Sequence, residues 1–136
     1  MDAETLIADG WKHRQSAGFT GQLGQLWICP DDPSRGVGMI VTREQCNNHI
    51  GTLHGGAVMT LAYVALGYGV TTALDGFACV TISLQAQFVA TARIGDFVVC
   101  RSEVIRRSKH LVFMRGLITT GETTIATADG IWKVIA

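Results

Sequence analysis

A chain of 136 residues is close to the commonest size of one protein domain, so we expect a single domain over residues 1–136. Apolar residues make up 48% of the chain and charged residues 16%, a balance that allows a buried core and excludes an intrinsically disordered protein. The 11 basic and 11 acidic side chains leave no net charge to attract nucleic acid or an anionic membrane, and we expect neither as a partner.

Two features of the sequence indicate the compartment. The chain begins Met1-Asp2-Ala3-Glu4 and has no apolar run behind a basic stretch, which is not the pattern of a secretory signal. The four cysteines are widely spaced, with no Cys-x-x-Cys pair and no histidine at a zinc-binding spacing. We therefore expect a cytoplasmic protein without a metal site, whose reduced thiols lie in the core. The cysteines are Cys29, Cys46, Cys79 and Cys100.

The first elements expected are a short helix and a β-hairpin. Residues 4–13 place Leu6, Ile7 and Trp11 at helical spacing, which predicts an amphipathic helix. Residues 21–29 and 37–42 contain apolar runs and flank a loop, residues 30–36, that holds both prolines. This order predicts two strands joined by a longer hairpin loop.

The longest apolar stretch begins after His54, ends at Leu74 and contains no charged residue. Its length approaches the roughly 20 residues that span a bilayer, so a membrane helix is one interpretation. Glycines and threonines dilute the stretch, however, and no basic flank follows it. The sequence therefore favours a helix that the rest of the protein buries on all sides.

The remaining chain has the alternation typical of strands. Apolar side chains occupy every second position in residues 79–89, and further strands are expected at residues 96–105, 111–119 and 124–134. The apolar row of the first strand is Val80, Ile82, Leu84, Ala86 and Phe88. Turn-forming residues separate the later strands, which predicts a meander. One buried helix and five or six antiparallel strands combine most simply as an α+β fold in which a curved sheet wraps a long central helix.

The segment Asn-His-Ile-Gly-Thr-Leu-His-Gly-Gly, residues 48–56, ends where the apolar helix begins and is the best candidate for a reactive site. A helix start leaves backbone N–H groups unpaired and carries a partial positive charge, so Gly55 and Gly56 can offer donors to a substrate oxygen. Such donors form an oxyanion-binding site. A glycine turn that lets the helix pack closely, with His54 as its cap, explains the same residues.

The order of these features resembles a known family. An Asn, five residues and then His-Gly-Gly at the start of a long apolar helix, followed by an alternating strand and a meander, is similar to the hotdog thioesterases of the phenylacetic-acid-degradation type, within the 4-hydroxybenzoyl-CoA thioesterase superfamily. The resemblance covers most of the chain, from about residue 21 to the end. It implies a hotdog fold and the hydrolysis of acyl-CoA or aroyl-CoA thioesters, with coenzyme A as part of the substrate and no separate cofactor.

The resemblance also assigns roles to single positions. In the family the N–H of the first glycine polarises the thioester carbonyl, and that glycine corresponds to Gly55. Asn48 and His54 correspond to residues that support the carbonyl and the site. Thr81 matches a hydroxyl that helps to hold the attacking water, although a polar residue on an alternating strand explains it equally. The acidic general base or nucleophile of the family follows the histidine by nine residues, where this chain has Tyr63.

Tyr63 departs from the family pattern. A carboxylate is ionised at neutral pH and can take a proton from water, whereas a phenol, with a usual pKa of about 10, is almost wholly protonated and cannot. Residues 45–74 contain neither Asp nor Glu, so we expect impaired hydrolysis. Three explanations of Tyr63 stay open: an introduced substitution, a natural replacement in a binding or altered-function relative, or a phenol that donates a hydrogen bond to the substrate.

The length of the helix predicts that a second chain completes the site. Tyr63 lies nine residues after His54, about 13.5 Å along the helix axis, so the helix start and Tyr63 of one chain cannot reach the same thioester. Two antiparallel helices related by a twofold axis bring the start of one beside position 63 of the other, which gives two composite sites per dimer. The resemblance implies such homodimers, often paired into tetramers.

A basic cluster and three large side chains complete the expected binding site. Arg106, Arg107, Ser108 and Lys109 suit the phosphates of coenzyme A, although a solvated charged turn is the alternative. The pocket depth is expected to depend on Met59, Tyr68 and Phe88. The leading hypothesis is an acyl-CoA thioesterase with impaired activity, and the alternative is a non-catalytic acyl-CoA-binding or sensing protein. A hotdog dehydratase is disfavoured because its acid is absent from the helix.

Overall fold

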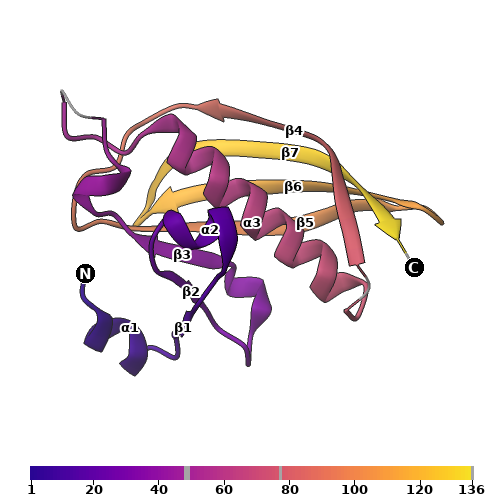
Figure 1. Cartoon of the computed structure of the whole chain (residues 1–136), viewed down its shortest axis with the longest axis horizontal. Helices are drawn as coiled ribbons and strands as arrows, with labels where there is room; N and C mark the ends of the chain where they lie inside the picture. The colour runs from indigo at the N-terminus through magenta and orange to yellow at the C-terminus, as the bar shows by residue number, and fades with distance from the viewer. Residues whose placement is uncertain (48–49, 77, 136) are drawn as a thin grey trace.

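The computed structural model describes residues 1–47, 50–76 and 78–135 and shows one long helix lying on a curved antiparallel sheet (Figure 1). The helices are α1 (Ala3–Ala8), α2 (Gly18–Gln22) and α3 (Gly55–Ala73), with the 3-10 helices η1 (Pro33–Arg35) and η2 (Arg43–Gln45). The strands are β1 (Lys12–Arg14), β2 (Leu26–Ile28), β3 (Val37–Ile40), β4 (Ala78–Phe88), β5 (Phe97–Arg107), β6 (Leu111–Thr120) and β7 (Thr123–Ile135). The expected α+β hotdog fold is confirmed.

The strand order in the sheet is β1-β2-β3-β5-β6-β7-β4, and every neighbouring pair is antiparallel. β2 and β3 form the predicted hairpin, and the meander consists of β5, β6 and β7. β4 precedes the meander in sequence but pairs with its last strand, so that Phe88 lies opposite Ala126. β4 is therefore an edge strand, and β1 adds one strand more than the predicted five or six.

The N-terminal prediction is right for its first half and wrong for its second. Asp2 caps α1 by accepting from the Thr5 N–H at 2.9 Å, but the helix ends at Ala8, and Gly10 turns the chain with a φ of +91°. Residues 12–14 then pair with β2, because the free edge of that strand satisfies their backbone groups. The strand expected at residues 21–29 likewise shortens to β2, since α2 occupies residues 18–22.

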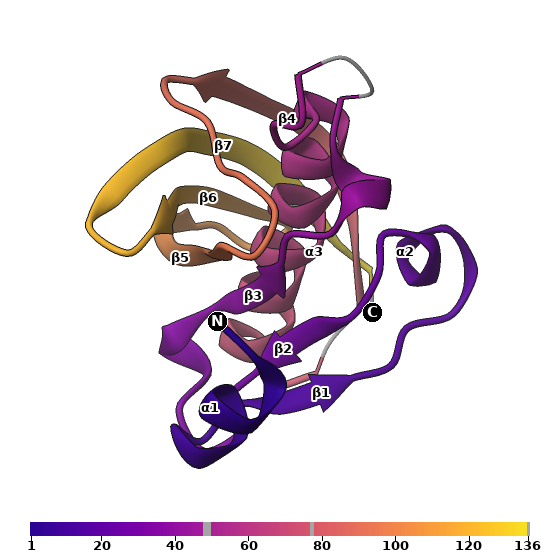
Figure 2. The ribbon, with the colours of Figure 1, turned by 90° about the vertical axis from the view of Figure 1, so that its left-hand side faces the viewer.

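α3 lies across the concave side of the sheet (Figure 2). Leu61, Leu66 and Val70 are fully buried in the main core with side chains from β3, β5, β6 and β7. By length and composition α3 could cross a membrane, but its burial against the sheet is that of a core helix.

The prediction that α3 is buried on all sides is wrong for the single chain. The helix turns one stripe away from the sheet, which we call the open stripe; it consists of Gly56, Thr60, Tyr63, Gly67 and Thr71. These residues recur every three or four positions, so they lie on one side of the helix. Tyr63 is 52% exposed there. The apolar composition of α3 predicts burial but cannot distinguish cover by the chain's own sheet from cover by another molecule.

A bulge in β4 changes which of its side chains face α3. The pairing with β7 shifts between Thr81 and Ser83, so the two halves of the strand present alternate positions to the helix. The predicted apolar row is therefore split: Leu84 and Ala86 pack on the core, whereas Ile82 is 55% exposed. Before the bulge it is Thr81 that faces the helix side, where it lines a cavity with Tyr63.

Candidate active site

The start of α3 presents one free backbone donor. His54 is the N-cap residue, and its Nδ1 accepts a hydrogen bond from the Gly56 N–H at 2.7 Å, which confirms that His54 caps the helix. The expectation that both glycines offer donors is therefore wrong, because the imidazole has taken the second N–H. Within the described residues the Gly55 N–H has no acceptor, and it points out at the positive end of the helix dipole.

The hydrogen bond to Gly56 also fixes the state of the imidazole. Since Nδ1 accepts, the neutral ring carries its proton on Nε2, which is then available as a donor. Sequence spacing contains no information about this tautomer. The ring is exposed and lines a cavity at the helix start, so the Nε2–H can reach a bound molecule.

A short backbone network positions His54. The His54 N–H donates to the Gln45 carbonyl at 2.8 Å, and the Leu53 N–H donates to Ala92 at 2.9 Å. Gln45 is itself buried and fixed, because its side chain accepts from the Thr42 N–H and donates to the Leu23 carbonyl. The helix start is thus tied to η2 and to the chain before β5. Asn48, the other predicted support of the carbonyl, lies outside the described residues.

Two cavities follow the open stripe of α3 from its start to Tyr63. The first, about 340 Å³, lies between His54 and Thr60 and is bounded on the other side by Phe19 and Glu44. The second, about 510 Å³, continues from Phe19 and Thr60 to Tyr63 and is mainly apolar. Met59, expected to set the pocket depth, lines the second cavity. Together the cavities form a trough that connects the free Gly55 end of the helix to position 63.

Two residues of this trough were not found from the sequence. Phe19 of α2 is 75% exposed and borders both cavities. Glu44 of η2 is a carboxylate at the helix start, one residue before the acid-free stretch 45–74. A lone exposed aromatic or acid in a distant turn gives no local signal, because only the tertiary fold brings it beside α3.

The predicted site residues fall into two groups within one chain. His54 and Gly55 lie at the helix start, where the Phe88 ring is 3.6 Å from the position a β-carbon on Gly55 would take. Tyr63 follows Gly55 by eight residues, about 12 Å along the helix. Thr81 joins Tyr63 at a further cavity of about 420 Å³, and Tyr68 also lines it. The chain by itself therefore does not bring the two groups together.

The basic cluster lies far from the helix start of the same chain. Arg106 and Arg107 are at the end of β5. Phe88, which lies beside Gly55, is aligned across β7 and β6 with Cys100 of β5. The segment of β5 from Cys100 to Arg106 spans roughly 20 Å. Ser108 is occupied in closing the turn, since its hydroxyl accepts from the Leu111 N–H. Only a second chain could place this cluster near a helix start.

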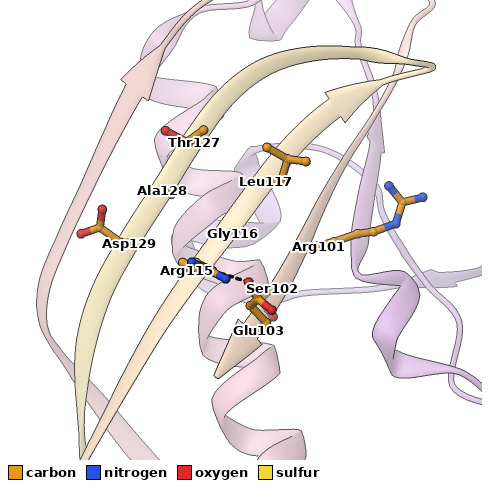
Figure 3. A pocket seen from close by; sticks show the side chains of 9 residues that line it. All are labelled: Arg101, Ser102, Glu103, Arg115, Gly116, Leu117, Thr127, Ala128 and Asp129. Atoms are coloured by element: carbon orange, nitrogen blue, oxygen red, sulfur yellow. Dashed lines mark hydrogen bonds and ion pairs between the residues drawn. The ribbon is translucent and has the colours of Figure 1, made fainter. Parts of the chain in front are cut away.

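A hollow of about 490 Å³ on the opposite, convex face of the sheet is not part of this site (Figure 3). Three of its four charged side chains already have partners: Arg115 pairs with Glu103 on the neighbouring strand, and Asp129 accepts from Gln85 at 2.8 Å, whereas Arg101 lies at the edge of the hollow. The hollow contains none of the predicted site residues. Its polar surface is that of a solvated sheet face.

The cysteines are free thiols, and burial raises the pKa of those that show a clear shift. The pKa of Cys100 rises to about 12 because the surrounding core disfavours the thiolate, and burial also raises the pKa values of Cys29 and Cys79. These thiols stay protonated at neutral pH and are not nucleophiles. In the described parts of the chain, no three His, Cys, Asp or Glu side chains converge on a point that could hold a metal ion.

Comparisons of sequence relate the chain to known proteins. The family described as "Thioesterase superfamily" matches residues 50–127, from the loop before α3 to the middle of β7. A candidate esterase of Pseudomonas aeruginosa is 31% identical over 111 residues, which cover 79% of this chain and 82% of that protein. Human acyl-coenzyme A thioesterase 13 is 25% identical over 112 residues, which cover 82% of this chain and 80% of that protein.

Solved structures show the same fold. The PaaI protein of the Escherichia coli phenylacetic acid degradation operon superposes with a TM-score of 0.70 at 21% identity, over 99% of this chain and 86% of that one. A Bacillus halodurans protein solved with CoA superposes with a TM-score of 0.66 at 26% identity, over 73% of this chain and 70% of that one.

Proposed function

The chain belongs to the thioesterase superfamily, and from that premise we propose that it is an acyl-CoA thioesterase, a hydrolase of acyl-CoA or aroyl-CoA thioesters. The observation that carries the proposal is the free Gly55 N–H at the start of α3, left available because His54 takes the N–H of Gly56. The name of the human relative and the CoA bound to the Bacillus halodurans protein support the substrate class.

In the proposed reaction, the thioester carbonyl oxygen accepts a hydrogen bond from the Gly55 N–H. Attack of water on the carbonyl carbon places negative charge on that oxygen, and the N–H and the positive end of α3 stabilise it. Collapse of the intermediate breaks the C–S bond. The products are a carboxylic acid and the thiol of coenzyme A, which receives the proton that the water has lost. His54 and Asn48 support the carbonyl in this scheme.

Position 63 is where the water would be activated. Tyr63 and Thr81 line one cavity, so their hydroxyl groups can both hold a water molecule, but a phenol is a poor base for taking its proton. We therefore expect slow hydrolysis by this chain. The general-base contribution that is missing is roughly 10²–10⁴-fold in rate. Polarisation of the carbonyl and positioning of the water would remain.

The proposal includes a homodimer in which each site uses two chains. The open stripe of α3 leaves Tyr63 half exposed, and the edge strand β4 exposes Ile82 and Phe88 beside an unpaired row of backbone groups. A long apolar edge strand is a surface on which proteins commonly pair. A twofold partner that covers the stripe and the strand would bring its own helix start close to Tyr63. The helix start of the same chain is about 12 Å away from Tyr63.

The nucleotide end of the substrate and the compartment belong to the same proposal. Arg106, Arg107 and Lys109 are exposed at the β5–β6 hairpin, and a second chain could present them to the phosphates of coenzyme A. Ser108 serves there by shaping the turn. A dimer of dimers and a cytoplasmic location stay predictions, the latter supported by four free cysteines.

The test is to restore the carboxylate. Steady-state hydrolysis of acetyl-CoA, a medium-chain acyl-CoA and benzoyl-CoA should rise by about 10²-fold or more in Tyr63→Asp relative to the unsubstituted chain. Tyr63→Asn is the matched control, because an Asn side chain has nearly the same size and polarity as Asp but cannot act as a base. The oligomeric state of each variant is measured in parallel, since an altered stripe could separate the chains.

The alternative is a non-catalytic protein that binds acyl-CoA, and the substitution of the base by Tyr63 is the observation that favours it. Tight binding of acyl-CoA, with no hydrolysis by either the unsubstituted chain or a dimeric Tyr63→Asp variant, would establish that alternative. An Asp variant that hydrolyses thioesters no better than the Asn variant at equal dimer content removes position 63 from the mechanism. Absence of both binding and hydrolysis excludes both functions.

A further inference from the structure

The cavity beyond Tyr63 has a distinct chemical character. It measures about 420 Å³ and lies between the second half of α3, the strands β1 and β2, and the start of β4. Aromatic side chains form much of its wall, with Tyr63, Tyr68 and Trp132 among them. Gly67 contributes no side chain, which leaves space in front of the Trp132 indole. The cavity therefore suits a flat or short apolar group.

In the part of the chain that the structure describes, Arg14 is the one charged side chain that lines this cavity. It lies on β1, where pairing of Arg14 with Leu26 fixes the backbone, and its guanidinium group stacks over the Tyr68 ring at 5.5 Å. Within the described residues Arg14 forms no ion pair and no hydrogen bond, unlike Arg35 and Arg115. A guanidinium group oriented by an aromatic ring, with no carboxylate partner, is able to bind an external anion.

The other polar groups of the cavity do not compete for this charge. Thr71 donates its hydroxyl to the Gly67 carbonyl at 3.0 Å, so it is already satisfied. Burial raises the pKa of the Cys79 thiol, so Cys79 stays neutral at physiological pH. Among the described residues that line the cavity, an anion therefore meets one positive group and no negative one.

In the proposed dimer the partner's helix start holds the thioester carbonyl beside Tyr63, so the spacing along α3 relates Arg14 to that carbonyl. Tyr68, over which Arg14 stacks, follows Tyr63 by five residues, about 7.5 Å of helix. A benzoyl group with a para substituent, or a short dicarboxylic chain, covers a distance of this order. We propose that this cavity receives the acyl group of the substrate and that Arg14 selects acyl groups whose far end carries a carboxylate. The inference rests on the proposed thioesterase function.

Binding of two matched thioether analogues tests the inference without requiring turnover. S-(4-carboxyphenacyl)-CoA and S-phenacyl-CoA differ only in the carboxylate and are not thioesters, so neither is hydrolysed. Isothermal titration of the unsubstituted chain should give roughly tenfold tighter binding of the carboxylated analogue, because a charge-assisted hydrogen bond is added. Arg14→Gln should abolish the preference, and Arg14→Lys should keep part of it.

Lys12→Gln is the matched control. Lys12 lies two residues before Arg14 on the same side of β1 and carries the same charge, but it is not among the residues that line the cavity. This variant should keep the preference for the carboxylate. A preference that is absent from the unsubstituted chain, survives in Arg14→Gln or disappears equally in Lys12→Gln overturns the assignment of Arg14.

Two further arms separate the anion of the acyl group from the phosphates of coenzyme A. If Arg14→Gln weakens the binding of both analogues and of free coenzyme A by the same factor, Arg14 binds a phosphate and the proposal is wrong.

Gly67→Ala adds a β-carbon 4.0 Å from Trp132 Nε1, an ordinary contact, so the variant should fold. It should weaken the binding of both analogues relative to that of free coenzyme A. Unchanged affinities would place the acyl group elsewhere. If neither the analogues nor coenzyme A binds the unsubstituted chain, both this inference and acyl-CoA binding are wrong. If Tyr63→Asp hydrolyses thioesters but Arg14→Gln does not change the preference for the carboxylate, this inference is wrong and the thioesterase proposal stands.

Discussion

Replacing His54 separates its role as a helix cap from its role in the site. His54→Ala removes the acceptor for the Gly56 N–H, a hydrogen bond of 2.7 Å at the start of the central helix. Loss of an N-cap costs about 1 kcal/mol in the free energy of unfolding, which lowers the melting temperature of a domain of this size by about 3–5 °C. His54→Asn keeps a capping acceptor and should restore most of that stability. It lacks the Nε2–H, however, so it should not restore binding or hydrolysis of a thioester.

Thermal unfolding followed by circular dichroism, at one fixed protein concentration, measures the effect on stability. Acyl-CoA binding and hydrolysis assays measure the effect on the site. His110→Ala is the control, because His110 is an exposed histidine of the β5–β6 turn whose backbone carbonyl, rather than its ring, accepts from Val134. The capping role is refuted if His54→Ala has the same melting temperature as His110→Ala, or if His54→Asn is as unstable as His54→Ala. Full activity in His54→Asn would show that the Nε2–H is not used.

Two further substitutions and one labelling measurement test the core and the trough. Gly116→Ala places a β-carbon 2.6 Å from Leu66 Cδ1 and 3.1 Å from Cys100 Sγ, so urea unfolding should show a loss of about 1–3 kcal/mol; an unchanged midpoint would contradict the packing. Because burial raises the pKa of Cys100 to about 12, mass spectrometry of the native protein at neutral pH should find Cys46 alkylated long before Cys100; early labelling of Cys100 would contradict its burial. Glu44→Gln should lower any residual hydrolysis by roughly 10²-fold if this carboxylate supplies the base, whereas an unchanged rate excludes it.

The sequence predicts the long elements well and the short ones poorly. α3 and the strands β5, β6 and β7 lie within about two residues of their expected bounds, because each is long enough for periodicity or an unbroken apolar run to dominate. β1 and α2 are different. The three residues of β1 become a strand only because β2 offers a free edge, and that edge is a property of the tertiary structure. No pattern within three residues can predict it.

The candidate site divides in the same way. The helix start was predictable because the glycines, the N-cap and the onset of the apolar run are neighbours in sequence. Even there, the structure was needed to show that His54 occupies the Gly56 N–H and leaves Gly55 free. Arg14 and Phe19 were not predictable, since they come from the N-terminal segment and reach α3 only through the packing of β1 and α2.

Tyr63 has two requirements to meet at once, and one more variant distinguishes them. Tyr63 lies on the open stripe, so a second chain on that stripe would bury its ring, and it also lines the cavity shared with Thr81. Tyr63→Phe keeps the ring and removes only the hydroxyl, so the dimer should persist in sedimentation. If the phenol donates a hydrogen bond to the substrate, binding of S-phenacyl-CoA should weaken by roughly tenfold. Equal affinity in a dimeric Phe variant would show that Tyr63 is an interface residue without a role in binding the substrate. Loss of the dimer would show that the hydroxyl itself holds the two chains together.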